Sequence, residues 1–421
     1  MFPLILLYVV LTIVRPQDYM PALVGVPVLS VVLMLAFASW LASSAKTFAA
    51  PQFVILPIFL VVLMVSTAVN GWFGGALDQL QKFGPVVIAF FVFAAACTQP
   101  RHLLVSMAVI VLCAAVLALH GIEQARTGMG WTGVPIGEDG RIQYVGIFND
   151  PNDLGLLFVT ALPMSVLLSR HGGFIGRLFW LGCSALLLYG VYLTNSRGAL
   201  LAVLMVAGVY IWRRRGAVLA SLLAAAGLAG MKLLSSRMQE LDAGEESASG
   251  RVDAWYTGMH LFTSHPIFGV GAGNFTEYND LTAHNSFVLV LAETGFVGYA
   301  LWLAFVCYSF WMMLSLLRYT PADTDDQIRP AQLQRERSVA LTLLLTLCGL
   351  FTAAFFLSRS YTIVMYLIIA MVTGHYVGAR QRLPGLRGFT LGNDWWRWVP
   401  AAMGSIVGLF VLVAILLRTS G

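Results

Sequence analysis

Residues 102–120 read HLLVSMAVIVLCAAVLALH, an apolar run that contains no Asp, Glu, Lys or Arg. A helix needs about 20 apolar residues to cross the hydrocarbon core of a bilayer, so this stretch predicts a membrane-spanning helix. The whole chain of 421 residues has a similar character: it is 59% hydrophobic and 11% charged. An average soluble domain has about 25% charged residues, so the composition predicts an integral membrane protein.

Twelve further apolar segments surround this one. Transmembrane β-strands alternate apolar and polar positions, whereas these runs are continuous, so helices are predicted and a barrel is excluded. The first segment is short and the last stands apart after a basic stretch. The expected fold is therefore an all-α polytopic bundle of about 12, or 13, transmembrane helices. The segments are residues 2–14, 22–42, 52–69, 83–98, 102–120, 153–169, 177–194, 198–212, 217–233, 285–315, 339–357, 361–377 and 398–417.

The basic residues in the connecting loops predict the orientation, because cytoplasmic loops are enriched in Lys and Arg. With the N-terminus in the cytoplasm, fifteen of the 25 basic residues fall in cytoplasmic loops. The opposite orientation would place the triplet Arg213–Arg215 outside, so it is rejected. The net charge of +5 is modest and is attributed to the loop arginines that set this topology. It does not indicate a nucleic-acid partner.

Two longer segments, 121–152 and 234–284, fall on the outer side and are rich in Gly, polar and aromatic residues. Neither is long enough for an ordinary domain with its own core, so both are expected to fold over the outer mouth of the bundle. The expected organisation is N-terminal helices in 1–120, a first outer loop in 121–152, helices in 153–233, a large outer loop in 234–284, and C-terminal helices in 285–421 with a cytoplasmic loop at 318–338.

Several arginines lie on the outer side, against the topology rule. Arg197 stands in the tight turn Thr-Asn-Ser-Arg-Gly-Ala, residues 194–199. A guanidinium held at the membrane boundary is suited to binding the diphosphate of a lipid-linked substrate. The alternative is an arginine that reaches to lipid headgroups. Arg251 opens an expected short amphipathic helix, and its alternative is a salt bridge with Asp253, Glu245 or Glu246.

Arg359 lies in the outward turn Ser358-Arg359-Ser360 and is a third candidate for the diphosphate, with headgroup contact as its alternative. Arg141 is a secondary candidate in the first outer loop. Asn149 and Asn152 precede the 153–169 span. They are also secondary candidates for substrate binding, and the alternative is that they cap that helix.

His284 and Asn285 stand where the large outer loop ends and the next span begins. Unpaired N–H groups and the helix dipole favour anions at such a position. The dipole also favours the neutral imidazole that a general base requires, so His284 is the catalytic candidate and Asn285 a neighbouring substrate contact. The alternative for His284 is a capping or interfacial residue. The Gly-rich turn at 265–275 could bring backbone close to a ligand.

The sequence predicts no metal site and no cofactor. The histidines show no HxxxH or HExxH spacing, and the outer loops contain no Asp-x-Asp pair. The positive charge that stabilises a diphosphate leaving group would then have to come from arginines.

Three stretches together resemble the bacterial O-antigen ligases and, more broadly, the superfamily that includes O-antigen polymerases and protein O-oligosaccharyltransferases. Residues 146–155, Gly-Ile-Phe-Asn-Asp-Pro-Asn-Asp-Leu-Gly, resemble the family's Gly-x-Phe-x-Asn-Pro-Asn stretch, with additional acidic residues at 150 and 153. Residues 194–199 are similar to its outward Ser-Arg-Gly turn. Residues 269–295, with Gly-Val-Gly-x-Gly-Asn-Phe, His-Asn-Ser-Phe and Glu-Thr-Gly, resemble its most recognisable segment.

The resemblance implies a glycosyltransferase-C-like membrane enzyme of the Gram-negative inner membrane, with a metal-independent active site facing the periplasm. It implies an undecaprenyl-diphosphate-linked glycan as donor, lipid A–core as acceptor, and membrane lipids around the bundle. Arg197 and Arg251 would hold the diphosphate, and His284 would orient or deprotonate the acceptor hydroxyl.

Two other interpretations stay open. A polymerase or a protein O-glycosylating enzyme of the same superfamily would share the donor and differ only in the acceptor. A transporter or flippase would place ionisable residues or broken helices at the bilayer midplane, whereas here they gather at boundaries and in outer loops.

Overall fold

The computed structural model describes residues 1–44, 46–234, 246–321 and 329–420. Over these residues the chain is helical, and its β-structure is limited to an isolated bridge between Met129 and Pro135. The expected all-α polytopic fold is confirmed. The helices are α1 (Phe2–Val14), α2 (Val28–Leu41), α3 (Gln52–Val69), α4 (Phe73–Ala96), α5 (Pro100–Thr127), α6 (Pro151–Leu168), α7 (Phe174–Leu193), α8 (Arg197–Arg215), α9 (Ala217–Leu234), α11 (Glu246–Ser264), α12 (Ser286–Arg318), α13 (Pro330–Ala354), α14 (Ile363–Arg382) and α15 (Leu391–Ser420).

Each of the thirteen apolar segments coincides with one of these helices, and α11 is the additional helix in the large loop. Among the described residues, nine helices are long and apolar enough to cross a membrane. The other four are α1, α2 and α9, whose apolar parts are shorter, and α8, which ends in Arg213–Arg215. The expected number of 12 or 13 spans therefore depends on these four shorter or more charged helices.

Some boundaries differ from the sequence expectation because helices continue beyond their apolar parts. Helix α5 runs on to Thr127, so the first outer loop is shorter than 121–152. Helix α13 begins at Pro330, so the last part of the expected cytoplasmic loop 318–338 is helical. These extensions carry charged side chains such as Glu123 and Arg335, which hydropathy alone assigns to a loop.

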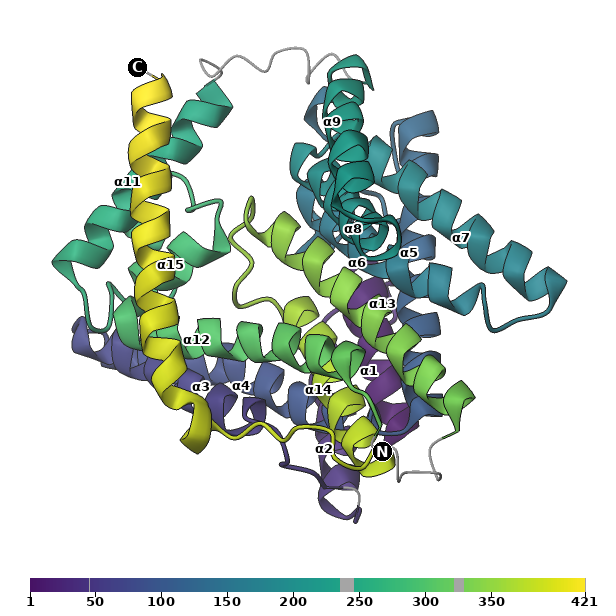
Figure 1. The fold of residues 1–421 in the computed structure, drawn as a ribbon. Coiled ribbons are helices and arrows are strands. Elements are labelled where there is room, and N and C mark those ends of the chain that lie inside the picture. Colours follow the sequence, from purple (N-terminus) through teal and green to yellow (C-terminus); the bar gives the residue numbers. More distant parts are fainter. Residues whose placement is uncertain (45, 235–245, 322–328, 421) are drawn as a thin grey trace.

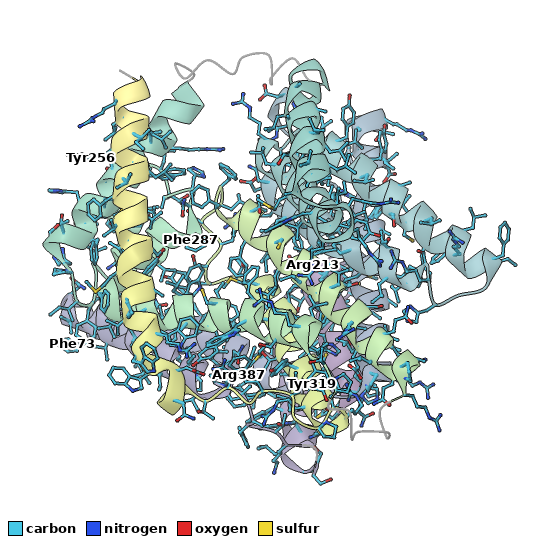
Figure 2. The ribbon with its side chains drawn as sticks, viewed as in Figure 1. Phe73, Arg213, Tyr256, Phe287, Tyr319 and Arg387 are labelled. Atoms are coloured by element: carbon cyan, nitrogen blue, oxygen red, sulfur yellow. The ribbon has the colours of Figure 1, made fainter. Side chains whose placement is uncertain are left out.

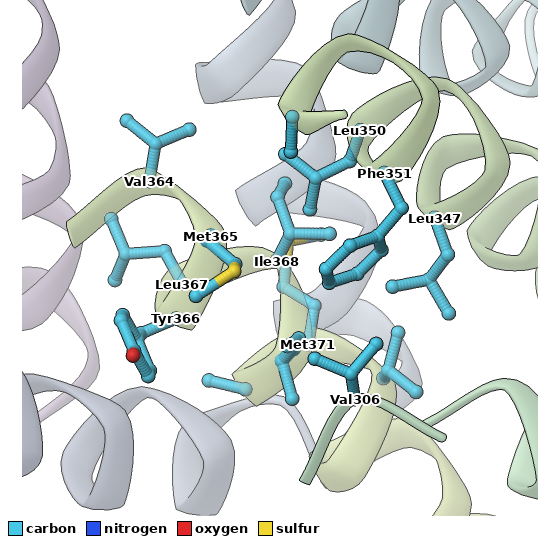
Figure 3. Packing of buried hydrophobic residues seen from close by; sticks show 14 of the residues in the cluster. Val306, Leu347, Leu350, Phe351, Val364, Met365, Tyr366, Leu367, Ile368 and Met371 are labelled. Carbon is cyan, nitrogen blue, oxygen red and sulfur yellow. The ribbon is translucent and has the colours of Figure 1, made fainter. Parts of the chain in front are cut away.

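Helix α14 is the centre of the bundle, with 89% of its apolar window buried, against 28% for α7 and 22% for α15. Figure 3 shows Leu347, Leu350 and Phe351 of α13 facing Ile368 and Met371 of α14. In Figure 1, α12 lies along α3, and α15 lies beside α11 at the edge of the molecule. The core of the bundle therefore lies around α14 and the part of α13 that faces it.

The loops gather at two ends of the bundle. At the first, the Tyr144 hydroxyl donates to the Val14 carbonyl at 2.8 Å, and Asn70 donates to the Gly269 carbonyl at 2.9 Å. We call this the His284 end. At the second, Arg382 donates to the Thr98 carbonyl at 3.0 Å. We call it the Arg382 end.

Figure 2 shows Tyr319 and Arg387 in the lower part of the molecule, near α14 and the lower end of α15. Tyr319 donates from its hydroxyl to the Pro384 carbonyl at 2.5 Å, which ties the loop after α12 to the loop after α14. Loops that the sequence assigns to one side of the membrane therefore lie together.

Helix α12 is broken at Gly295, whose φ of 62° and ψ of −161° lie outside the helical region. The segment before α12 runs beside this break: Val270 N–H donates to Ala292, and Phe296 N–H donates to Pro266. A Cβ on Gly269 would lie 2.3 Å from the Glu293 carbonyl carbon. The glycines of the 265–275 turn thus allow a close approach to α12, where sequence alone suggested an approach to a ligand.

Candidate functional site: an arginine pocket at the His284 end

A cavity of about 250 Å³ lies at the His284 end, between the start of α6, the α7–α8 turn, α11 and the end of α13. We call it the arginine pocket because three arginines from separate segments of the chain line it. Its lining residues are Arg141, Asn152, Asn195, Ser196, Arg197, Gly198, Ala199, Arg251, Val252, Trp255, Ala353, Phe356 and Leu357.

The α7–α8 turn places Arg197 as the first residue of α8. Ser196 caps this helix, since its hydroxyl accepts from the Ala199 N–H at 3.3 Å. Asn195 turns the chain with a left-handed φ of 46°. The positive end of the α8 dipole and the Arg197 guanidinium therefore face the same cavity, an arrangement that favours an anion.

The turn is packed tightly against α6 through Gly155. A Cβ at Gly155 would lie 2.6 Å from the Ala199 Cβ, so only glycine permits this approach without movement. A Cβ at Gly198 would lie 3.2 Å from the Phe356 Cβ, which is a less severe approach. Close packing on both sides fixes the position of Arg197 in the pocket.

Arg141 reaches the pocket from the loop after α5. Its Nε donates to the Thr194 carbonyl at 3.0 Å, and its terminal nitrogen donates to the Asn152 side-chain oxygen at 3.0 Å. Asn152 in turn donates to Asp150 from both its backbone N–H and its side chain. The loop after α5, the start of α6 and the α7–α8 turn are thereby joined in one network.

Arg251 enters from the first turns of α11, whose Trp255 lines the same cavity. Trp255 is 5% exposed and packs edge-on against Phe355, so it is a buried wall residue. Of the salt-bridge partners considered for Arg251, residue 245 and the side chain of residue 246 lie outside the part that the structure describes.

His284 and Asn285 lie where α12 begins. Asn285 caps the helix: its side-chain oxygen accepts from Phe287 N–H at 2.9 Å and Val288 N–H at 3.1 Å, and the residue is fully buried. His284 precedes it with a left-handed φ of 44° and is half-buried. It does not line the arginine pocket.

The pKa of His284 is lowered from its usual value, first by burial and then by the positive charge of Arg251. Arg359 also lowers it, and the Asp150 carboxylate opposes the shift. His284 is thus within electrostatic reach of a pocket arginine, and its environment favours the neutral imidazole.

Arg359 lies beside this group and is paired with Asp153 of α6. Its Nε and a terminal nitrogen donate to the two carboxylate oxygens of Asp153 at 2.6 and 2.5 Å. Asn149 is exposed after the short helix Gly146–Phe148 and does not line the pocket. The structure thus places Arg141, Asn152, Arg197 and Arg251 in one cavity, with His284 and Arg359 adjacent and Asn285 buried as a cap.

Sequence reasoning noted the acidic residues at 150 and 153 but did not assign their roles in this site. Asp150 caps α6 by accepting from Asn152 N–H at 2.7 Å, and Asp153 binds Arg359. The Asp-Pro pair at 150–151 carries a signal for the cap, since Asp is favoured at the N-cap and Pro at the first helical position. Nothing in the local sequence indicates the partner of Asp153.

An apolar groove of about 900 Å³ adjoins the pocket. It is lined by α8, α9, α12 and α13, and it shares the Phe356 side chain with the arginine pocket. Its walls include Leu204, Trp212 and Phe310. A hydrocarbon surface therefore runs up to a cavity lined with cations.

A family model described as O-antigen ligase matches residues 182–303, from the middle of α7 to the middle of α12. This range contains Arg197, Arg251 and His284, together with the α8 and α9 walls of the groove. A comparison with curated proteins finds no match. With the polytopic helical fold, this match over residues 182–303 supports membership in the superfamily of O-antigen ligases and polymerases.

Proposed function

We propose that the protein is an O-antigen ligase, which transfers a glycan from undecaprenyl diphosphate to lipid A–core at the periplasmic face of a Gram-negative inner membrane. The observation that carries this proposal is the convergence of Arg141, Arg197 and Arg251 on one cavity beside His284. These residues come from three segments that the sequence places on the same side of the membrane.

The lipid part of the donor finds support in the apolar groove. A polyprenyl chain is hydrocarbon, and the groove offers Leu, Phe and Trp side chains that lead to the arginine pocket. Such a chain could lie among α8, α9, α12 and α13 while its diphosphate reaches Arg197. A soluble nucleotide-sugar donor would have no use for this surface.

The diphosphate is assigned to Arg197 and Arg251. Guanidinium groups bind phosphate oxygens through two parallel hydrogen bonds, which a lysine does not reproduce. The N-terminus of α8 adds backbone N–H groups at the same place. We expect this cationic environment to stabilise the leaving group without a metal ion and without a cofactor.

His284 acts on the acceptor. The acceptor hydroxyl oxygen forms a bond to the anomeric carbon while the bond from that carbon to the diphosphate oxygen breaks. The proton passes to the His284 ring, and undecaprenyl diphosphate leaves as the anion held by the arginines. Attack in line with the leaving group inverts the anomeric centre, and the base contributes about 10²–10⁴-fold.

The test is a transfer reaction with purified protein in EDTA, supplied with undecaprenyl-diphosphate glycan and lipid A–core. We expect native protein to shift the lipid A–core band and His284→Ala to lose this product. Growth of a lipid-linked ladder without that shift would replace the ligase by a polymerase. No product from folded native protein would contradict both and favour a transporter.

A further inference from the structure

We infer that Asp153 and Arg359 form a clasp that sets the position of His284 relative to the arginine pocket. Both are then positioning residues for the transfer, and neither touches the reacting atoms. This inference rests on the proposed function for its role in turnover, although the clasp itself is a feature of the fold.

The clasp is the ion pair between these two side chains. Arg359 binds both oxygens of Asp153 in a fork arrangement, and the Asp153 side chain is 6% exposed. The two residues are 206 positions apart in the sequence. The pair therefore ties the α13–α14 turn to the first turn of α6, where Asn152 lines the arginine pocket.

A set of hydrogen bonds joins the turn that carries Arg359 to the start of α12. The Ser286 hydroxyl donates to the Leu357 carbonyl at 2.6 Å and accepts from the Arg359 N–H at 3.1 Å. The Ser360 hydroxyl donates to the Ser286 carbonyl at 2.9 Å. Three hydrogen bonds thus hold Ser286, which lies two residues after His284.

His284 needs such support because its own backbone is strained. A non-glycine residue with a φ of 44° is held there only when its surroundings determine it. The Asn285 side chain caps α12 directly after His284. The clasp holds the α13–α14 turn, which is hydrogen-bonded to Ser286 at the start of the same helix. Loosening the clasp should let the ring move away from the acceptor hydroxyl.

This reasoning favours a holding role for Arg359 over direct contact with the diphosphate. Two N–H groups of its guanidinium already donate to the buried Asp153 carboxylate. A guanidinium that gave up this carboxylate for a phosphate would leave Asp153 buried without its charge partner, which is a costly exchange.

The chain offers a matched control at the Arg382 end. Glu336 of α13 is also 6% exposed, and it accepts from Arg382 of α14 at 2.7 and 3.2 Å. Glu336 lies near the start of α13 and the clasp follows its end, so the two pairs are separated by about 27 Å of helix. Breaking either pair removes a similar buried contact, but only one of them is near His284.

The experiment compares native protein with Asp153→Asn, Arg359→Gln, the double variant, Arg359→Lys and Glu336→Gln. Transfer kinetics give kcat and the KM for the lipid-linked donor. Diethyl pyrocarbonate, which reacts with neutral imidazole, gives the titration of His284 when its peptide is followed by mass spectrometry across pH. The second measurement needs no substrate, so it tests the clasp even if the proposed transfer fails.

We expect kcat to fall by about 10- to 100-fold in each clasp variant, because small displacements of a reacting group have effects of this size. The donor KM should stay within about two-fold, since Arg197 and Arg251 are intact. The double variant should resemble the single ones, because both side chains act through one contact. Arg359→Lys should recover part of the activity, and Glu336→Gln should keep its kcat.

The modification data should report the contribution of the Arg359 charge to the pKa of His284. His284 faces Arg251 from α11, Asp150 from the start of α6, and Arg359 from the α13–α14 turn. Removing Arg359 should raise the pKa of His284, because its positive charge helps to lower that pKa. Unchanged modification and kcat in both variants would overturn the clasp. A raised donor KM in Arg359→Gln alone, or an equal loss of kcat in Glu336→Gln, would also overturn it.

Discussion

Arg197 begins helix α8 and Arg213 lies in its last turn, so one helix supplies both a pocket arginine and a control. Replacing Arg197 or Arg251 by Lys keeps the charge and removes the fork that binds two phosphate oxygens. We expect a loss of transfer of about 10-fold or more in each, equivalent to about 1.4 kcal/mol. Initial rates at equal protein levels give the comparison.

Arg213→Lys at the far end of α8 should transfer glycan at the native rate. If both pocket variants also kept the native rate, Arg197 and Arg251 would be removed from the mechanism.

The lowered pKa of His284 predicts the pH dependence of transfer. A base must be unprotonated, so kcat/KM should rise with pH through the pKa of the free enzyme and level off above it. Because burial and Arg251 lower this pKa, the rise should lie below about 6.5, the ordinary value for histidine. The measurement is kcat/KM from acidic to neutral pH, and His284→Gln should lack this acidic limb. A midpoint above the ordinary histidine value would contradict the assignment.

At the scale of single residues, the sequence indicated the candidate side chains but not how they pair. Arg197, Arg251 and His284 stand out because each is a polar residue at a predicted turn or helix start. The pairing of Arg359 with Asp153 depends on how α6 packs beside the α13–α14 turn, and this arrangement is set by contacts over the whole bundle. Local patterns do not encode it.

Helix α12 depends on a single glycine at its break. Gly295 has a φ of 62°, and a Cβ there would lie 2.5 Å from the carbonyl carbon of Ile267. We expect Gly295→Ala to destabilise the protein by roughly 1–3 kcal/mol from backbone strain, with the clash added. A thiol-reactive dye that detects exposure of buried Cys97, Cys113 and Cys183 on heating would report a lower unfolding temperature.

Gly404 of α15 provides the comparison, since a Cβ there meets nothing within 4 Å. Gly404→Ala should unfold at the native temperature or slightly above it, because alanine favours helix by about 1 kcal/mol. Equal unfolding temperatures for Gly295→Ala and native protein would show that the break needs no glycine.

The helices themselves could be predicted from hydropathy, because each must satisfy its own backbone in lipid. The break in α12 could not, because Glu-Thr-Gly also fits a continuous helix. Its geometry follows from the 266–271 segment, whose backbone bonds replace those of the helix. Similarly, the α13 extension to Pro330 is polar and lacks the apolar signal.

The orientation that the loop charges predict for the whole molecule can be tested by labelling. Tyr278 is exposed in the segment before α12, and Gln334 is exposed in the first turns of α13. A membrane-impermeant maleimide should label Tyr278→Cys in spheroplasts and should label Gln334→Cys only after permeabilisation. The native cysteines measure the background. The reverse pattern would place the arginine pocket in the cytoplasm and exclude a periplasmic reaction.

The central claim is that the arginine pocket and its groove form a binding site for a lipid diphosphate. The most direct measurement is equilibrium binding of undecaprenyl diphosphate to the purified protein in EDTA, with undecaprenyl monophosphate as the comparison. We predict that the diphosphate binds at least about 10-fold more tightly than the monophosphate, and that Arg197→Lys and Arg251→Lys reduce this preference. Equal affinity for the two lipids, or a preference that survives in both variants, would contradict the account.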